Sequence, residues 1–565
     1  MSTSAKSSIL LLMRTKYIFI TGGVISTLGK GVTTGALAAL LQAKGYRVTC
    51  VKCDAYVNID AGTMNPTEHG EVFVTEDGVE TDQDIGIYER FLNRRLGTVN
   101  YLTTGQIYKS VIERERNLEY DGKCVEVVPH VPEELIRRLK QAAKKDEADI
   151  VLSEIGGTVG EYQNVLFLEA DRMLKREHSN DVVNIHVSYL PIPETVGEMK
   201  TKPVQYSIRT LQSAGIQPEF VVCRASRPLD EKRKEKIALF GNVEVDNIIS
   251  NHDVESIYEV PLIFEKQRFA EKVLKALNLP KKRTKVARGN TVHAWHQLVK
   301  KIKRVDEPVK IGIIGKYFDT GDFVLEDSYI SVIEAIKHAA WAFNRKPIIQ
   351  WIDSKIFERA AVDELEKLME CDGLIVPGGF GKRGIEGKIN AISFARTHKI
   401  PYLGLCYGMQ LAVIEFARNV LKLEEAHTEE IEPKTKYPVI HTLPEQLKLI
   451  AGKKYGATMR LGAYDCVLDK ASQVFSLYKR SKISERHRHR YEFNNEYRQQ
   501  VEQAGLKVSG INPERNLVEI VELADHPYFV GVQFHPEFES RPLKPHPLFV
   551  GIVRAGIERS RKRTL

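Results

Sequence analysis

Short apolar runs alternate with longer stretches of helical periodicity along most of the chain. Residues 16–23 (KYIFITGG), 46–54 (YRVTCVKCD) and 148–157 (ADIVLSEIGG) read as strands. Residues 32–45 (VTTGALAALLQAKG) have apolar side chains at helical spacing. Because a strand covered on both faces is apolar throughout, this alternation predicts an α/β fold with parallel sheets.

The alternation stops near residue 280 and then restarts. Residues 278–290 (NLPKKRTKVARGN) are basic and poor in apolar side chains, whereas 310–317 (KIGIIGKY) begins a new series of strand-like runs. A chain of 565 residues is also too long for one hydrophobic core. We therefore predict two doubly wound domains, 1–280 and 309–565, joined by a linker, 281–308.

Composition narrows the class of function. The net charge of +8, from 82 basic and 74 acidic residues, suits anionic ligands but is too small to indicate nucleic-acid binding. Seven scattered cysteines make no disulfide framework and are typical of a reducing compartment. No apolar run approaches the roughly 18 residues of a membrane span, so we expect a cytoplasmic protein. The sequence does not indicate a role for residues 1–12.

Residues 401–410 (PYLGLCYGMQ) place Cys406 between two glycines at the end of an apolar run. A lone cysteine in such a run is usually a core residue. However, G-x-C-x-G between a strand and a helix is typical of a nucleophile elbow, in which small neighbours permit a tight turn. The helix N-terminus behind it favours the thiolate.

A base and an oxyanion site are also encoded. His535 and Glu537 lie in FVGVQFHPEF, and residues two apart on a strand point to the same face. We thus expect Glu537 to orient His535, which takes the thiol proton. The glycine-rich residues 376–384 (VPGGFGKRG) offer N–H groups to an oxyanion. Each motif alone is more often structural, but in this order they resemble a class I glutamine amidotransferase domain.

That resemblance implies the substrate of the second domain. Cys406 would attack the side-chain amide of glutamine and release ammonia. Glu430 and Arg490 match positions that hold the amino and carboxylate groups of the substrate. For Arg490, in RHRHRYE, a solvated charge run is the alternative interpretation. The residues implied to contact glutamine are Gly379, Tyr407, Gly408, Met409, Gln410, Glu430 and Arg490.

A glycine-rich loop in the first half indicates phosphate binding. Residues 22–35 (GGVISTLGKGVTTG) resemble a P-loop, but five residues separate Gly23 from Gly29, and Gly31 stands where Ser or Thr would bind magnesium. Glycine N–H groups, a helix N-terminus and Lys30 would still hold phosphate. The residues predicted to contact ATP are Ser26, Thr27, Leu28, Gly29, Lys30, Gly31 and Asp84.

Acidic residues suited to Mg²⁺ accompany this loop. Asp84 lies in EDGVETDQDIG, and Glu154 ends a strand-like run, where ligands bind in open α/β sheets. One or two carboxylates with phosphate oxygens are the usual ligands of Mg²⁺. Asp82, Asp84 and Glu154 are therefore candidate ligands; for the first motif, a plain acidic loop is the alternative.

Two lysines precede a proline in residues 198–207 (EMKTKPVQYS). Because proline restricts the preceding residue to an extended conformation, Lys202 and Lys200 are expected along a fixed strand, where they would face a triphosphate. A solvated Lys-Thr-Lys is the commoner interpretation on composition alone.

Together with HGEVFVTEDG (69–78) and KIALF (236–240), these motifs resemble the CTP synthase family over about residues 14–560. The resemblance implies a dethiobiotin-synthetase-like amidoligase followed by a glutaminase. ATP would phosphorylate O4 of UTP, and ammonia would displace the phosphate to give CTP. Lys30 and Lys52 would stabilise the transferring phosphoryl group. By the same resemblance, Asp84 and Glu154 would hold Mg²⁺.

Further roles follow from the same resemblance. His69 and Val72 match positions near the ammonia entrance. The resemblance implies a homotetramer, activation by GTP and inhibition by CTP. The sequence does not indicate a GTP site or filament formation. The residues implied to bind UTP are Ser26, Lys200, Thr201, Lys202, Pro203, Val204, Gln205 and Lys236.

Two positions depart from the family pattern. Tyr407 follows the nucleophile, where the family usually has an aliphatic residue, and its ring would reshape the glutamine pocket or cover the oxyanion. Gln163 replaces an acidic residue in a stretch associated with CTP feedback, so we expect altered product inhibition. An amidating ligase of other specificity and an inactive, structural family member are the competing interpretations.

Overall fold

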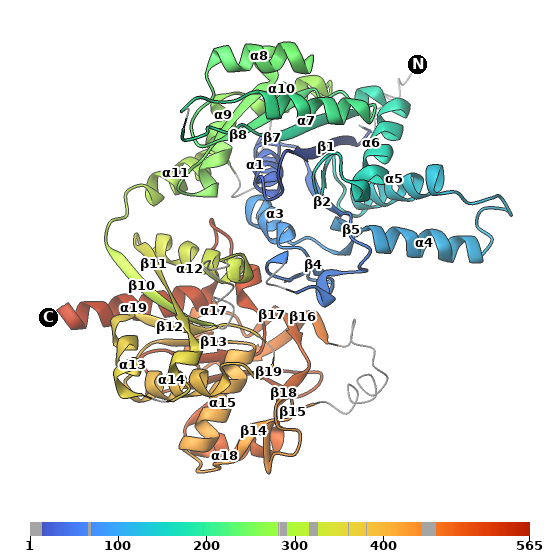
Figure 1. Ribbon diagram of the computed structural model, residues 1–565. Coiled ribbons are helices and arrows are strands. Elements are labelled where there is room, and N and C mark those ends of the chain that lie inside the picture. The colour runs from blue at the N-terminus through green and yellow to red at the C-terminus, as the bar shows by residue number, and fades with distance from the viewer. Residues whose placement is uncertain are drawn as a thin grey trace, which may run out of the picture. The chain divides into compact units, whose positions relative to one another are not determined.

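The computed structural model covers both halves of the chain (Figure 1). The described residues are 14–65, 69–195, 197–280, 282, 291–315, 326–359, 361–379, 381–442 and 459–564. The N-terminal extension 1–12 and most of 281–290 lie outside them.

The chain divides into two units that are not simply its two halves. The first contains Met1–Ile59 and Val99–His296, and the second contains Asp60–Thr98 and Gln297–Leu565. A segment of the N-terminal half therefore packs with the C-terminal half. The contiguous boundaries 1–280, 281–308 and 309–565 stay a prediction.

A seven-stranded sheet forms the first unit, in the order β5-β2-β6-β1-β7-β8-β9. Every neighbouring pair is parallel, as the apolar runs predict. The strands are β1 Lys16–Gly23, β2 Val48–Asp54, β5 Tyr101–Thr103, β6 Ile150–Ile155, β7 Val182–Tyr189, β8 Phe220–Ala225 and β9 Ile248–His252.

Helices follow most of these strands, which confirms the α/β prediction for this unit. Tyr17 and Phe19 of β1 pack in the hydrophobic cluster that also holds Leu135 and Leu174 from the covering helices. The helices are α1 Lys30–Ala43, α4 Thr104–Arg116, α5 Val127–Lys145, α6 Val165–Glu177, α7 Lys202–Ser213, α8 Glu231–Gly241, α9 Val260–Lys266 and α10 Phe269–Ala276, with α11 Val292–Ile302 spanning the unit boundary.

The second unit has a nine-stranded mixed sheet, ordered β11-β10-β12-β13-β21-β20-β19-β16-β17. Strands from β11 to β21 pair in parallel, and those from β21 to β17 pair antiparallel. The strands are β10 Pro308–Gly315, β11 Lys346–Asp353, β12 Gly373–Val376, β13 Tyr402–Leu405, β16 Arg460–Leu468, β17 Lys482–His489, β19 Leu506–Asn512, β20 Leu517–Leu523 and β21 Phe529–Val532.

The centre of this sheet is buried on both faces. Leu374 and Val376 of β12 pack in one hydrophobic cluster, and Ile375 packs in the other, so the apolar run belongs to a strand that is covered twice. The helices are α3 Asp84–Leu92, α12 Ile330–Ala342, α13 Val362–Glu366, α14 Ile385–Thr397, α15 Tyr407–Asn419, α17 Gln473–Tyr478, α18 Arg498–Gln503 and α19 Pro547–Thr564. Among the helices that the structure describes, none is long and apolar enough to cross a membrane.

Small sheets and buried charges complete the second unit. β3 (Phe73–Val74) pairs with β4 (Glu80–Thr81), and β15 (Tyr437–Thr442) pairs with both β14 (Ala426–Thr428) and β18 (Tyr491–Phe493).

The guanidinium of Arg486 lies 3.0 Å from both carboxylate oxygens of Glu89, and both side chains are inaccessible to solvent. Because an unpaired buried charge is very costly, this pair ties α3 to β17.

Candidate active site

Cys406 occupies a strained turn between β13 and α15. Its φ of 51° and ψ of −99° are rarely adopted by a residue other than glycine. A Cβ at position 408 would lie 2.2 Å from the carbonyl oxygen of Val376, so only glycine fits there. The turn predicted from the G-x-C-x-G spacing is therefore present, with the thiol at the start of a helix.

His535 and Glu537 meet beside this turn. Nδ1 of His535 lies 2.7 Å from Oε1 of Glu537. The expectation that both lie on a strand is wrong: β21 ends at Val532, and Glu537 lies in the 3₁₀ helix Pro536–Glu539. The ring of Phe538 stacks on the imidazole at a centroid distance of 5.1 Å and fixes its orientation. A tight turn, and not the alternation of side chains along a strand, therefore brings His535 and Glu537 together.

The imidazole of His535 is held in its protonated form. Burial alone would lower its pKa, but the Glu537 carboxylate and Cys406 outweigh burial and raise the pKa to about 10. The imidazolium is thereby available as an acid for the leaving group.

A cavity of about 80 Å³ opens on the Cys406 thiol. Gly378, Gly379, His535 and Glu537 are among the residues that line it. A Cβ on Gly378 would lie 2.8 Å from Cε1 of His535, so the close approach of loop and imidazole requires glycine. Gly379 therefore lies next to the nucleophile, as an oxyanion-loop residue should.

The glycine-rich loop of the first unit also has the predicted form. β1 leads into it, Gly29 has a φ of 83°, and α1 begins at Lys30. The Lys30 ammonium is nearly buried and donates a hydrogen bond to the carbonyl oxygen of Gly157 at 2.8 Å. Ser26 and Thr27 are exposed at the tip of the loop. Backbone N–H groups and a cation thus meet at a helix N-terminus, which suits phosphate.

Lys52 and Glu154 lie together at the carboxyl ends of β2 and β6. The Lys52 ammonium is 3.3 Å from Oε1 of Glu154 and 3.6 Å from Oδ1 of Asp54. Thr34 of α1 donates a hydrogen bond to Oε2 of Glu154 at 3.1 Å. Two carboxylates and a hydroxyl at this edge fit Mg²⁺ bound mainly through phosphate oxygens. Asp54 is an acidic residue that the sequence reasoning missed.

The structure describes no site with three protein ligands for a metal among its placed residues. Asp84 begins α3 in the second unit, whereas Glu154 belongs to the first. Their joint binding of Mg²⁺ stays a prediction.

Lys202 is not on an extended strand, so that expectation is wrong. α7 begins at Lys202, and Pro203 occupies its first turn. Proline suits this position because its missing N–H would have no partner inside the helix. Val204 and Gln205 therefore lie on the first turn of α7, and Lys200 precedes it, paired with Glu198.

Comparison with known proteins identifies the combination. The model of the CTP synthase N-terminus matches residues 16–279, and that of class I glutamine amidotransferases matches 324–555. The CTP synthase of Caldanaerobacter subterraneus subsp. tengcongensis is 50% identical over 541 residues, 96% of this chain and 98% of that protein. The chain belongs to the CTP synthase family.

A second relative supports this membership. The CTP synthase of Clostridium beijerinckii is 47% identical over 98% of this chain and all of its own length. A solved glutaminase domain of Trypanosoma brucei CTPS with bound acivicin is 37% identical, with a TM-score of 0.41. It covers 44% of this chain and 94% of its own.

Sequence reasoning missed several residues at the cysteine of this CTP synthase family member. Nε2 of Gln533 lies 3.7 Å from the Cys406 sulfur, and the backbone carbonyl oxygen of Arg488 lies 3.8 Å from it. The Arg488 guanidinium binds Glu80 at 2.7 Å. Both residues lie in motifs that were singled out for other side chains: Gln533 in FVGVQFHPEF, with His535, and Arg488 in RHRHR, with Arg490.

That motif is not a solvated charge run. Arg486, His487 and His489 of β17 are at most 2% exposed. Burial lowers the pKa of both histidines well below the ordinary value, so both imidazoles are neutral. Nδ1 of His487 lies 3.0 Å from Nε2 of His489. Arg490 follows β17, and its contact with glutamine stays a prediction.

Val72 and Glu71 both line the cavity beside Cys406, and the place of Val72 near an ammonia entrance stays a prediction. The Glu71 carboxyl accepts hydrogen bonds from the hydroxyl and the backbone N–H of Ser331. Burial raises the pKa of Glu71 to about 8 against the opposing effect of Ser331. Glu71 was missed because only its neighbours His69 and Val72 were singled out. The role of His69 stays a prediction.

His186 was missed as well. It joins β1 to α7 by bonding the Thr21 hydroxyl at 2.9 Å and the Ser207 hydroxyl at 2.6 Å. Burial and then the charge of Lys30 lower its pKa to about 3, so the imidazole is neutral. The segment that contains Lys202 is thereby anchored to the strand that leads into the phosphate loop. Lys236 lies in α8, and its contact with UTP stays a prediction.

The raised pKa of His535 predicts an alkaline limit for glutamine hydrolysis. Below about pH 10 the imidazolium can protonate the departing ammonia; above it that proton is lost, so the rate should fall. The rate of glutamate release, measured between about pH 7 and pH 11, should fall with a midpoint near pH 10, and circular dichroism is the control for unfolding. A midpoint near the ordinary histidine pKa of about 6.5 would contradict the raised pKa of His535.

Proposed function

We propose that this chain makes CTP from UTP, ATP and glutamine at two separate sites. Membership of the CTP synthase family supports the overall reaction. The observation that carries the glutaminase assignment is Cys406 in a strained elbow against the hydrogen-bonded pair His535 and Glu537. The phosphate loop with Lys30 and Lys52 marks the synthetase site.

Glutamine hydrolysis follows from the geometry at Cys406. The thiolate attacks the side-chain carbonyl carbon, and backbone N–H groups of Gly379 and Tyr407 stabilise the resulting oxyanion. His535 then donates its proton to the amide nitrogen, so ammonia leaves and a thioester remains. Water, deprotonated by His535, releases glutamate and regenerates the thiol. Glu537 keeps the imidazole oriented throughout.

Synthesis of CTP follows at the phosphate loop. Lys30 and Lys52 stabilise the charge of the γ-phosphoryl group as it passes from ATP to O4 of UTP. Ammonia then adds to C4, and the C4–O bond breaks to release inorganic phosphate. Glu154, with Asp84 or Asp54, would hold Mg²⁺, which neutralises phosphate charge during transfer.

Binding of the nucleotides is part of the same proposal. ATP lies on the loop 26–31, and UTP contacts Ser26, the segment 200–205 and Lys236. The exposed loop tip and the cationic first turn of α7 support this arrangement.

Regulation and assembly are also part of the proposal. We expect a cytoplasmic homotetramer that GTP activates and CTP inhibits. Gln163 donates a hydrogen bond to Glu161 at 2.8 Å, so the acidic side chain beside it is already engaged. That contact supports weaker or less selective inhibition by CTP. Ordinary, nucleotide-selective inhibition in a CTP titration would overturn this point.

The decisive experiment measures products from UTP, ATP and Mg²⁺ with either glutamine or ammonia. We expect equal amounts of CTP, ADP and phosphate with both nitrogen sources, plus equal glutamate when glutamine is used. A different aminated product would support an amidating ligase of other specificity. Absence of any product would support an inactive family member.

Tyr407 is expected to tune the glutamine site. Burial raises its pKa, so its hydroxyl stays a donor, and it hydrogen-bonds the carbonyl oxygen of Gly381 at 3.4 Å. The N–H of Gly381 donates to Glu430 at 2.9 Å, so the tyrosine braces the loop that positions the proposed glutamine-binding carboxylate.

Loss of that hydroxyl in Tyr407→Phe should raise KM for glutamine by about twofold to tenfold, the effect of one net hydrogen bond. The ammonia-dependent rate should not change. Tyr437→Phe, on β15, serves as the control. An unchanged KM would show that Tyr407 is only a core residue.

A further inference from the structure

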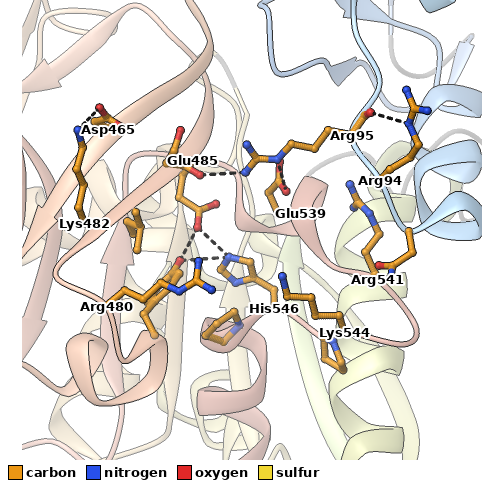
Figure 2. Close-up of a pocket in the computed structure, with 16 residues that line it drawn as sticks. Arg94, Arg95, Asp465, Arg480, Lys482, Glu485, Glu539, Arg541, Lys544 and His546 are labelled. Carbon is orange, nitrogen blue, oxygen red and sulfur yellow. Dashed lines mark hydrogen bonds and ion pairs between the residues drawn. The ribbon is translucent and has the colours of Figure 1, made fainter. Parts of the chain in front are cut away.

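A second, larger pocket of about 680 Å³ lies in the second unit (Figure 2). Residues 93–95, which follow α3, line it together with β17, the segment before α19 and Tyr478 at the end of α17. Its size falls within the range of small-molecule sites. It shares no lining residue with the cavity at Cys406.

Two cations in this pocket have side chains without a partner among the residues that the structure describes. Among its six basic side chains, Lys482 pairs with Asp465 at 2.6 Å, and Arg95 pairs with Glu539 at 3.0 Å. Within the described part of the chain, the side chains of Arg480 and Lys544 make no hydrogen bond or ion pair. A guanidinium and an ammonium left together in a pocket favour an anionic ligand, and phosphate matches both groups.

One oxygen of a buried carboxyl group in the same pocket has no donor among the described residues. Glu485 is 4% exposed, and its Oε1 accepts a hydrogen bond from Tyr478 at 2.8 Å and lies 3.1 Å from Nε2 of His546. Its Oε2 has no hydrogen-bond partner among the described residues. Because a buried acceptor without a donor is costly, this atom indicates a ligand N–H or ammonium group.

The pocket is connected to the glutaminase triad through the segment 537–546. The backbone N–H of Ser540 donates to the carbonyl oxygen of Glu537 at 3.3 Å, and the N–H of His546 donates to the Ser540 hydroxyl at 3.4 Å. His546 in turn contacts Glu485. A chain of contacts therefore runs from Glu485 to the segment that orients His535.

We propose that this pocket binds a small phosphorylated molecule that also carries an amino group, and that the bound molecule changes glutamine hydrolysis. Arg480 and Lys544 hold the phosphate, and Oε2 of Glu485 accepts a hydrogen bond from the amine.

Two probes of matched structure test binding: O-phosphoethanolamine, and ethyl phosphate, which lacks the amine. Ligand-observed NMR on the full-length protein should give phosphoethanolamine an affinity about tenfold higher, as expected for one hydrogen bond to a charged group. Glu485→Gln should remove this preference, and the double variant Arg480→Ala/Lys544→Ala should weaken both probes about tenfold. Lys30→Ala should leave the binding intact, which excludes the phosphate loop as its source.

The control is Lys434→Ala/Lys470→Ala, which removes the same charge from exposed positions outside the pocket. Equal affinities for both probes in wild type, or equal weakening in the control, would overturn the site. Thermal unfolding checks that Glu485→Gln still folds; the double variant changes only exposed side chains. Unchanged kcat and KM for glutamine with phosphoethanolamine bound would overturn the effect on hydrolysis.

Discussion

Replacing Cys406 with alanine is expected to abolish CTP formation from glutamine and to leave CTP formation from ammonia unchanged. The alanine variant keeps a small side chain at the strained turn. What it loses is the nucleophile. Removal of a covalent nucleophile lowers the rate by on the order of 10⁴-fold or more, and His535 cannot replace it.

CTP formation should be measured with saturating glutamine and, separately, with ammonium chloride at about pH 8, where part of the ammonium is deprotonated. Cys371→Ala is the matched control, because Cys371 is also fully buried in the second unit but lines neither pocket. It should retain both activities. Loss of the ammonia-dependent reaction in Cys406→Ala would contradict two separate sites.

The fold was largely predictable because its signals are local. Parallel strands such as β1 and β12 are apolar throughout, and each is followed by a helical pattern or a glycine-rich turn. The antiparallel part of the second sheet was not predicted, since its strand β17 carries charged side chains. The counter-charges of Arg486 are Glu539 and Glu89, and the pair with Glu89 joins residues almost 400 positions apart in sequence. No pattern near either residue shows that pairing.

The same distinction holds for the active sites. Cys406 and the His535–Glu537 pair were predictable from spacing alone, even though the strand argument for the pair was wrong. Gln533 and the Arg488 carbonyl come close to the sulfur through sheet geometry, and a backbone atom has no sequence signature. The error at Lys202 has a different origin. Proline limits the residue before it, but it also favours a helix N-terminus, and here the second tendency prevailed.

Lys30→Ala is expected to impair CTP synthesis and to spare glutamine hydrolysis, whereas Cys406→Ala abolishes glutamine hydrolysis and spares synthesis from ammonia. CTP formation should fall on the order of 10³-fold with either nitrogen source, because a fixed cation no longer faces the transferring phosphoryl group. Glutamate release should stay near the wild-type rate, since Lys30 belongs to the first unit and Cys406 to the second. Phosphate release from ATP with UTP present, but without a nitrogen source, should fall in parallel.

A matched control is Lys44→Ala, which removes a cation just beyond the other end of α1, where Lys44 pairs with Glu265 at 3.0 Å and also with Glu271. It should retain synthesis with both nitrogen sources. Lys30 is nearly buried and hydrogen-bonds Gly157, so thermal unfolding must show that its variant is folded. If folded Lys30→Ala protein still made CTP from ammonia at the wild-type rate, the lysine would only brace the loop. Phosphoryl transfer would then depend on Lys52, the other cation at this sheet edge.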